Sequence, residues 1–96
     1  MAQGDVFSAG PTSIASLGFL DIQPAAGVEA VINNIYHEDS VTVQFWDGTN
    51  GILFDSAIGS GVYAAFQFHV VNARRIRVRN DAGVAKLVAY DGIQTK

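Results

Sequence analysis

Short apolar runs separated by turn residues constrain the fold of this 96-residue chain more than any other feature of its sequence. The runs are rich in Val, Ile, Phe and Tyr, and Gly, Asp or Asn separates one run from the next. Branched and aromatic residues favour strands, whereas Gly, Asp and Asn favour tight turns. No stretch has the apolar spacing that an amphipathic helix requires. The pattern therefore predicts an all-β protein.

Turn signals at intervals of about 8–12 residues favour a single-domain antiparallel β-sandwich of about seven strands, jelly-roll or Ig-like, with a barrel as the alternative. The third strand alternates cleanly, because its Val and Phe residues face one way and Thr42, Gln44 and Trp46 face the other. The sequence DGTNG at 47–51 then predicts a hairpin turn. The expected strands are residues 14–22, 28–36, 41–46, 52–55, 62–71, 75–79 and 84–90.

The N-terminal residues look different from the rest of the chain. Residues 1–12 contain few large apolar side chains, and Gly4, Gly10 and Pro11 interrupt any regular element. We expect residues 1–12 to be a flexible arm that becomes ordered on a partner, and residues 13–96 to form the sandwich domain.

The composition predicts self-association. Hydrophobic residues make up 49% of the chain and charged residues only 16%, against about 25% in an average globular protein. A small domain has too little polar surface to cover such a chain, so we expect a homo-oligomer, taken as a trimer. There is no cysteine, which excludes disulfides and thiol chemistry. No signal peptide is recognisable and no apolar run approaches the ~20 residues of a membrane span, so no membrane partner is expected.

Fixed charges are distributed unevenly along the chain. Residues 1–73 contain no Lys or Arg, and all six basic residues lie in residues 74–96. Within an alternating strand, Arg75, Arg77 and Arg79 share one face at a spacing of about 7 Å. Three interpretations of this stripe are open: a solvated strand face, a protein-binding face and a nucleic-acid-binding face. The acidic pI near 5.0 argues against the nucleic-acid-binding face. We predict that it contacts carboxylates of a neighbouring copy or of a larger assembly, because each guanidinium binds a carboxylate through two hydrogen bonds.

Catalytic and metal-binding motifs are not recognisable. The turn residues 37–39, with Asp47 and Asp55, offer metal ligands but lack the spacing of a calcium loop. The two histidines, His37 and His69, accompany no Gly-x-Ser-x-Gly elbow and no phosphate-binding loop. We therefore expect no enzymatic activity, no cofactor and no metal.

Aromatic residues provide an alternative hypothesis. Trp46 falls on the more polar face of its strand, and with Tyr63 and Tyr36 it could form a platform on which a sugar stacks. The alternative function is therefore a carbohydrate-binding or adhesin module. The competing interpretation of the same residues is a cross-strand aromatic cluster or a subunit contact.

Three segments resemble a known group of proteins. They are NIYHE at 34–38, FWDGTNGILFD at 45–55 and AKLVAYDGIQTK at 85–96. They are similar to segments of small structural proteins encoded by tailed bacteriophages, over roughly residues 28–96. The resemblance implies a virion component, assembled in the host cytoplasm, that decorates or cements the phage capsid. Its motifs are turn-and-strand patterns, so no binding residue can be carried over.

Overall fold

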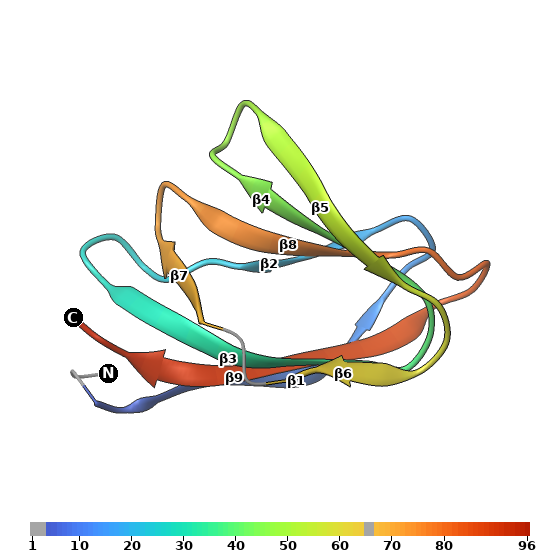
Figure 1. Cartoon of the computed structure of the whole chain (residues 1–96), viewed down its shortest axis with the longest axis horizontal. Helices are drawn as coiled ribbons and strands as arrows, with labels where there is room; N and C mark the ends of the chain where they lie inside the picture. The colour runs from blue at the N-terminus through green and yellow to red at the C-terminus, as the bar shows by residue number, and fades with distance from the viewer. Residues whose placement is uncertain (1–3, 65–66) are drawn as a thin grey trace.

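The computed structural model describes residues 4–64 and 67–96, which form nine strands in two antiparallel sheets packed face to face (Figure 1). The predicted all-β sandwich is confirmed. Among the described residues there is no helix long and apolar enough to cross a membrane. The strands are β1 (Val6–Ile14), β2 (Phe19–Ile22), β3 (Glu29–His37), β4 (Val41–Trp46), β5 (Gly51–Ala57), β6 (Gly61–Tyr63), β7 (Phe68–Val71), β8 (Arg75–Asn80) and β9 (Lys86–Gln94).

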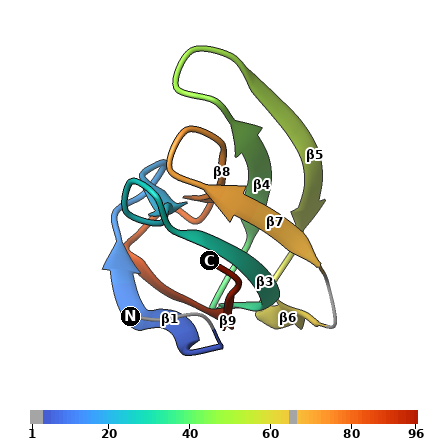
Figure 2. The same cartoon turned by 90° about the vertical axis from the view of Figure 1, so that its left-hand side faces the viewer.

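The two sheets combine strands that are distant in the sequence. The five-stranded sheet has the order β1-β9-β3, and both β6 and β7 pair with the far side of β3. The four-stranded sheet has the order β2-β8-β4-β5. The end-on view shows the sheets as separate layers, with the β4–β5 hairpin extending beyond the other strands (Figure 2). Strand β5 is therefore an edge strand of the four-stranded sheet.

Two of the expected strands are divided in the structure. Residues 14–22 were expected to be continuous, but β1 ends at Ile14 and β2 begins at Phe19 because the chain crosses there from one sheet to the other. The crossing uses a positive φ of 62° at Leu17. Residues 62–71 contain β7 and part of β6, which pair with opposite ends of β3, and residues 65–66 between them lie outside the described part of the chain. The third expected strand, Val41–Trp46, has the predicted bounds.

Residues 6–12, which were expected to form a flexible arm, are part of strand β1 in the structure. Strand β1 pairs with β9 from Val6 to Ile14, and its residues Phe7 and Ile14 are buried. Gly10 does not end the strand, because it lies in a bulge of the β1–β9 pairing with a φ of 99°. A Cβ atom at Gly10 would lie 2.8 Å from that of Ala89, so a side chain would not fit at this position. Residues 1–3 lie outside the described part of the chain.

The core lies between the sheets and consists mainly of branched aliphatic side chains. Strand β8 shows the alternation predicted from sequence, since Ile76 and Val78 are buried and its arginines lie on the opposite face. The strand ends on a buried polar residue, Asn80. Its side chain donates hydrogen bonds to the carbonyls of Ile14 and Val84, and thereby joins β1, β8 and the following turn. The core residues with no exposed surface are Ile22, Ile32, Ile35, Val43 and Val78.

Candidate interaction surfaces

The arginine stripe lies on the outer face of the four-stranded sheet, and its first two members have a carboxylate partner in the same chain. Arg77 is opposite Asp21 in the β2–β8 pairing, and its Nε lies 2.7 Å from Asp21 Oδ1. Arg75 Nε lies 3.6 Å from the same oxygen. The sequence prediction placed the carboxylate on another molecule. The sequence does not show that β2, which carries Asp21 and is far from β8 along the chain, lies beside β8 in the sheet.

Arg77 also stacks between two aromatic rings. Its guanidinium carbon lies 4.0 Å from the ring centroid of Phe19 and 4.8 Å from that of Trp46. Cation–π attraction and the rings' cover hold this side chain at 19% exposure. Trp46 and Arg77 therefore cover part of each other's surface, and neither presents its full surface to a partner.

Arg79 is the most exposed member of the stripe. Its Nε lies 2.7 Å from Asp81 Oδ1, and the hydroxyl of Thr42 donates to the other oxygen of that carboxylate. A hollow of about 400 Å³ adjoins this cluster and reaches across to Asp55 and Ser56 on β5. Of the three arginines, Arg79 is thus the one that a partner can reach.

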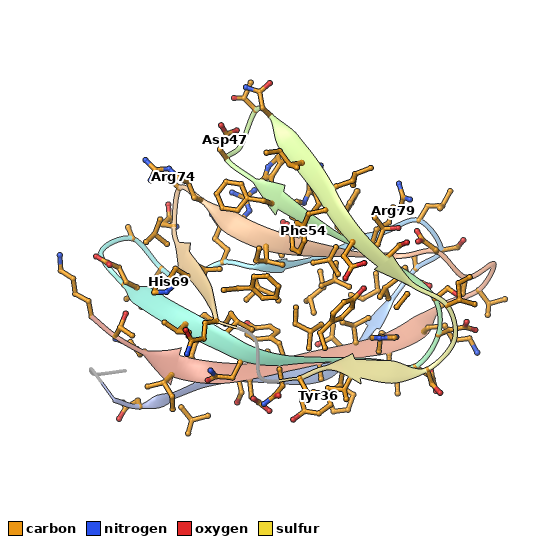
Figure 3. The ribbon with its side chains drawn as sticks, in the orientation of Figure 1. Tyr36, Asp47, Phe54, His69, Arg74 and Arg79 are labelled. Carbon is orange, nitrogen blue, oxygen red and sulfur yellow. The ribbon has the colours of Figure 1, made fainter. Side chains whose placement is uncertain are left out.

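The aromatic platform expected for a sugar is not assembled. Trp46 lies on the outer face of the four-stranded sheet, whereas Tyr63 is only 9% exposed in the core and its ring lies 5.6 Å from that of His37. Tyr36 points outward from the five-stranded sheet, on the opposite side of the molecule from Arg79 (Figure 3). The prediction that Tyr63 binds a partner is therefore wrong, because burial removes it from the surface.

The candidate metal and catalytic residues have local structural contacts. His37 Nδ1 lies 3.0 Å from the carbonyl oxygens of both Asp39 and Gly59. Asp47 accepts hydrogen bonds from the backbone amides of Asn50 and Thr49, which lower its pKa below the ordinary value of 3.8. Over residues 4–64 and 67–96, no three His, Asp or Glu side chains come together as a metal site would require. These contacts show structural roles in turns for His37 and Asp47.

A polar cluster that the sequence analysis missed lies on the outer face of the five-stranded sheet. Asp91 accepts hydrogen bonds from the Tyr36 hydroxyl and the Asn34 amide, both at 2.7 Å. The hydrogen bond to Asp91 raises the pKa of Tyr36 above 10.0, with smaller contributions from burial and from the carboxylate charge. No sequence signal joins these residues, because Asp91 is 55 positions from Tyr36.

Exposed apolar side chains surround this cluster. We call them the sheet patch. Cross-strand pairs place them on one face, since Val6 is opposite Ile93 and Tyr36 is opposite Val62. A small hollow of about 160 Å³, lined in part by Pro11, Tyr36 and Leu87, adjoins the patch. The members of the sheet patch are Val6, Tyr36, Val62, Leu87 and Ile93, which are 40–63% exposed.

A second apolar surface follows β5, and we call it the β5 patch. Six of the seven residues of β5 are exposed, although the strand is largely apolar. The Asp-Gly-Thr-Asn-Gly turn predicted the hairpin, but an edge position cannot be recognised without knowing the sheet order. The members of the β5 patch are Ile52, Leu53, Phe54 and Ile58, and Ile58 is 96% exposed.

Comparison with known proteins identifies no family. No protein-family model matches the chain, and no curated protein matches it.

Proposed function

We propose that this protein is a non-enzymatic structural component of a phage virion. It decorates or stabilises the capsid by associating with copies of itself and by binding the shell. The observation that carries the proposal is the exposure of two apolar surfaces, the sheet patch and the β5 patch, on a chain of 96 residues. Monomeric soluble proteins rarely expose large contiguous apolar patches, and such patches mark interaction sites.

Two separate surfaces suit a component that makes two kinds of contact. The sheet patch lies on the outer face of the five-stranded sheet, whereas the β5 patch lies at the edge of the other sheet. One surface can bind a second copy while the other contacts the shell. Arg79, beside its hollow, adds a charged group at the β5 side.

The virion assignment is supported by the resemblance to small tailed-phage proteins. The resembling segments correspond to parts of β3, the β4–β5 hairpin and β9. These elements include the centre of the five-stranded sheet and the strand that carries the β5 patch. The resembling segments therefore include some members of each patch, namely Tyr36, Leu87 and Ile93 of the sheet patch and Ile52, Leu53 and Phe54 of the β5 patch.

Sedimentation and particle binding test the proposal. The purified protein is expected to sediment as an oligomer. It is also expected to co-migrate in a density gradient with heads of the tailed phage that encodes it. The neighbouring genes provide an independent test, since a capsid or tail gene is expected beside this one. A protein that stays monomeric at high concentration and binds no particle would contradict the proposal.

A further inference from the structure

The free edge of β5 is the most distinctive unpaired feature of the described structure. In residues 4–64 and 67–96, β5 pairs with β4 alone, from Gly51 to Ala57. Its other edge therefore offers backbone N–H and C=O groups that no strand of the described chain takes up. Natural edge strands are usually protected by Lys, Pro or inward charges. β5 contains neither Lys nor Pro; its bulge and its single charge, the inward-directed Asp55, protect the second half of the strand and leave the first half open.

The pairing with β4 fixes which way the β5 side chains face. Ile52 is opposite Phe45, which packs against the core, so Ile52 faces the other sheet. The ring of Phe54 lies 5.4 Å from that of Phe68 in the five-stranded sheet, so Phe54 faces the same way. Leu53 lies between them, opposite Gln44, and therefore faces outward.

A bulge interrupts this alternation at Phe54, which has no partner in β4. The register shifts between Val43 and Gln44, and Asp55 is opposite the buried Val43. Asp55 is thus directed to the same side as Phe54. The regular part of the edge is consequently the uncharged stretch from Gly51 to Leu53, and Phe54 follows at the bulge.

We propose that the β5 edges of two copies pair antiparallel about a twofold axis at Leu53. The inference names the partner of the β5 patch and rests on the self-association proposed above. In this register Leu53 meets Leu53 of the second copy on the outer face, and Ile52 meets Phe54 on the inner face. Side chains in register thus share a face, as antiparallel pairing requires.

The charges favour a second copy as the occupant. A strand that pairs with itself about a twofold axis must be complementary to itself, and an uncharged apolar stretch satisfies this condition. In this register Asp55 lies opposite Gly51 of the second copy. Because glycine has no side chain, the Asp55 carboxylate stays hydrated. The two Asp55 carboxylates lie about 13 Å apart along the strands, beyond the screening length of ~8 Å at physiological salt.

Such pairing joins two four-stranded sheets into one continuous eight-stranded sheet. It also brings Leu53, which is 58% exposed, and Phe54, which is 41% exposed, out of water. A twofold contact of this kind makes a dimer, and so differs from the trimer expected from composition.

Single cysteines test the register, because the chain has no cysteine of its own. Leu53→Cys places two thiols on directly opposed strand positions, where Cα atoms about 4.5–5.5 Å apart allow a disulfide. Ile58→Cys is the control, since residue 58 is more exposed but would lie about 33 Å from its counterpart. Under mild oxidation, Leu53→Cys is expected to form a covalent dimer much faster than Ile58→Cys. Equal or reversed rates would overturn the proposal.

A charged residue at position 53 tests how much the pairing of the two β5 edges contributes to dimer stability. Leu53→Lys removes apolar contact and places two ammonium groups together, so the dimer is expected to weaken by about tenfold or more. Ile58→Lys adds the same charge outside the pairing and is expected to leave the dimer unchanged. Light scattering gives the mass, and circular dichroism checks the fold. If Leu53→Lys does not fold, the cysteine comparison decides.

The outcomes separate this inference from the proposed function. If the wild type is an oligomer that Leu53→Lys leaves intact, the β5 pairing is wrong and self-association uses another surface. If the wild type is a monomer at all concentrations, self-association itself is contradicted and the inference fails with it.

Discussion

Arg77 and Asp21 lie side by side on neighbouring strands, with Nε 2.7 Å from Oδ1, although the chain separates them by more than half of its length. The pair joins the acidic first part of the chain to its basic last part. Phe19 and Trp46 cover the guanidinium, so the contact is shielded from water on two sides. The uneven charge of the sequence is therefore partly balanced inside one molecule.

Removing this pair is expected to destabilise the fold. Arg77→Ala loses an ion pair and two ring contacts, and leaves Asp21 without its closest partner, so the unfolding free energy is expected to fall by about 2 kcal/mol. Denaturant unfolding measures the loss, and Trp46, the only tryptophan, reports the local change by fluorescence. Arg74→Ala, at an exposed loop position, is the matched control and is expected to change stability by less than about 0.5 kcal/mol. Equal effects of the two substitutions would contradict the role of the pair.

Arg79 is expected to matter for association rather than folding. Its side chain is 33% exposed beside the hollow formed with β5. If a partner carboxylate is desolvated there, Arg79→Ala costs roughly 2–5 kcal/mol of association, whereas a rim contact changes mainly the on-rate and its salt dependence. Oligomer mass and particle binding at low and moderate salt measure the effect, with Arg74→Ala as the control. Unchanged association at every salt concentration would leave Arg79 as a solvated charge.

Asn80 is expected to be a main polar contributor to stability. Its amide donates to the carbonyls of Ile14 and Val84, and its oxygen accepts from the Ala82 amide. Asn80→Ala leaves the buried Ile14 carbonyl and two part-buried backbone groups without this partner, at a cost of about 2 kcal/mol or more. Thermal unfolding tests this value against Asn72→Ala, which removes one hydrogen bond from an exposed loop residue and should cost about 1 kcal/mol at most. A smaller loss at Asn80 than at Asn72 would contradict the assignment.

The N-terminal strand is expected to be part of the folded unit. Phe7 is buried against Tyr90, at a centroid distance of 5.7 Å, whereas its neighbour Val6 is 63% exposed on the other face. Phe7→Ala should lower the unfolding free energy by about 3 kcal/mol, and Val6→Ala by less than about 0.5 kcal/mol. Limited proteolysis gives a second measurement, since cleavage between residues 6 and 14 should be as slow as cleavage in the core. Rapid cleavage between residues 6 and 14 would instead support the flexible arm that was predicted from the sequence.

Tyrosine ionisation is expected to couple to stability at high pH. The pKa of Tyr36 is raised above 10.0, chiefly by its hydrogen bond to Asp91, so the protonated form is favoured in the folded protein. The contribution of this contact is therefore fully present below pH 10.0 and is lost as pH rises through the higher folded-state pKa. Burial also raises the pKa values of Tyr63 and Tyr90.

Asp91→Asn isolates the Tyr36 contribution. The substitution removes the carboxylate charge and weakens the hydrogen bond, so the pKa of Tyr36 should fall toward its ordinary value. Ultraviolet absorbance during alkaline titration measures the shift, with Tyr36→Phe to assign the transition. An identical titration curve in the wild type and in Asp91→Asn would show that the contact is absent in solution.

Local chemistry explains why parts of the fold were predictable from sequence. The alternation in residues 41–46 requires only that one face of β4 be buried, and the structure has these bounds. The following hairpin depends on Asp47, which accepts hydrogen bonds from residues two and three positions later. Both features are decided within a few residues, so a single sequence contains the information.

Long-range pairing explains what sequence could not predict. Residues 6–12 are weak strand formers, and they become a strand because β9, about 80 residues away, provides the pairing surface. The carboxylate that Arg77 contacts depends in the same way on β2 lying beside β8. The exposure of β5 follows from its place at the end of the order β2-β8-β4-β5, which no local pattern encodes.

The pairing of β1 with β9 also has a practical consequence for engineering. The Gly4 amide donates to the Gln94 carbonyl and the Gln94 amide donates to that of Asp5, so the start of β1 and the end of β9 lie side by side. A short linker can therefore join them at little loop-closure cost. A circular permutant opened at the turn after Asn80 would keep every strand pair of both sheets and carry new termini at the opposite end of the sandwich, where a fused peptide could be displayed.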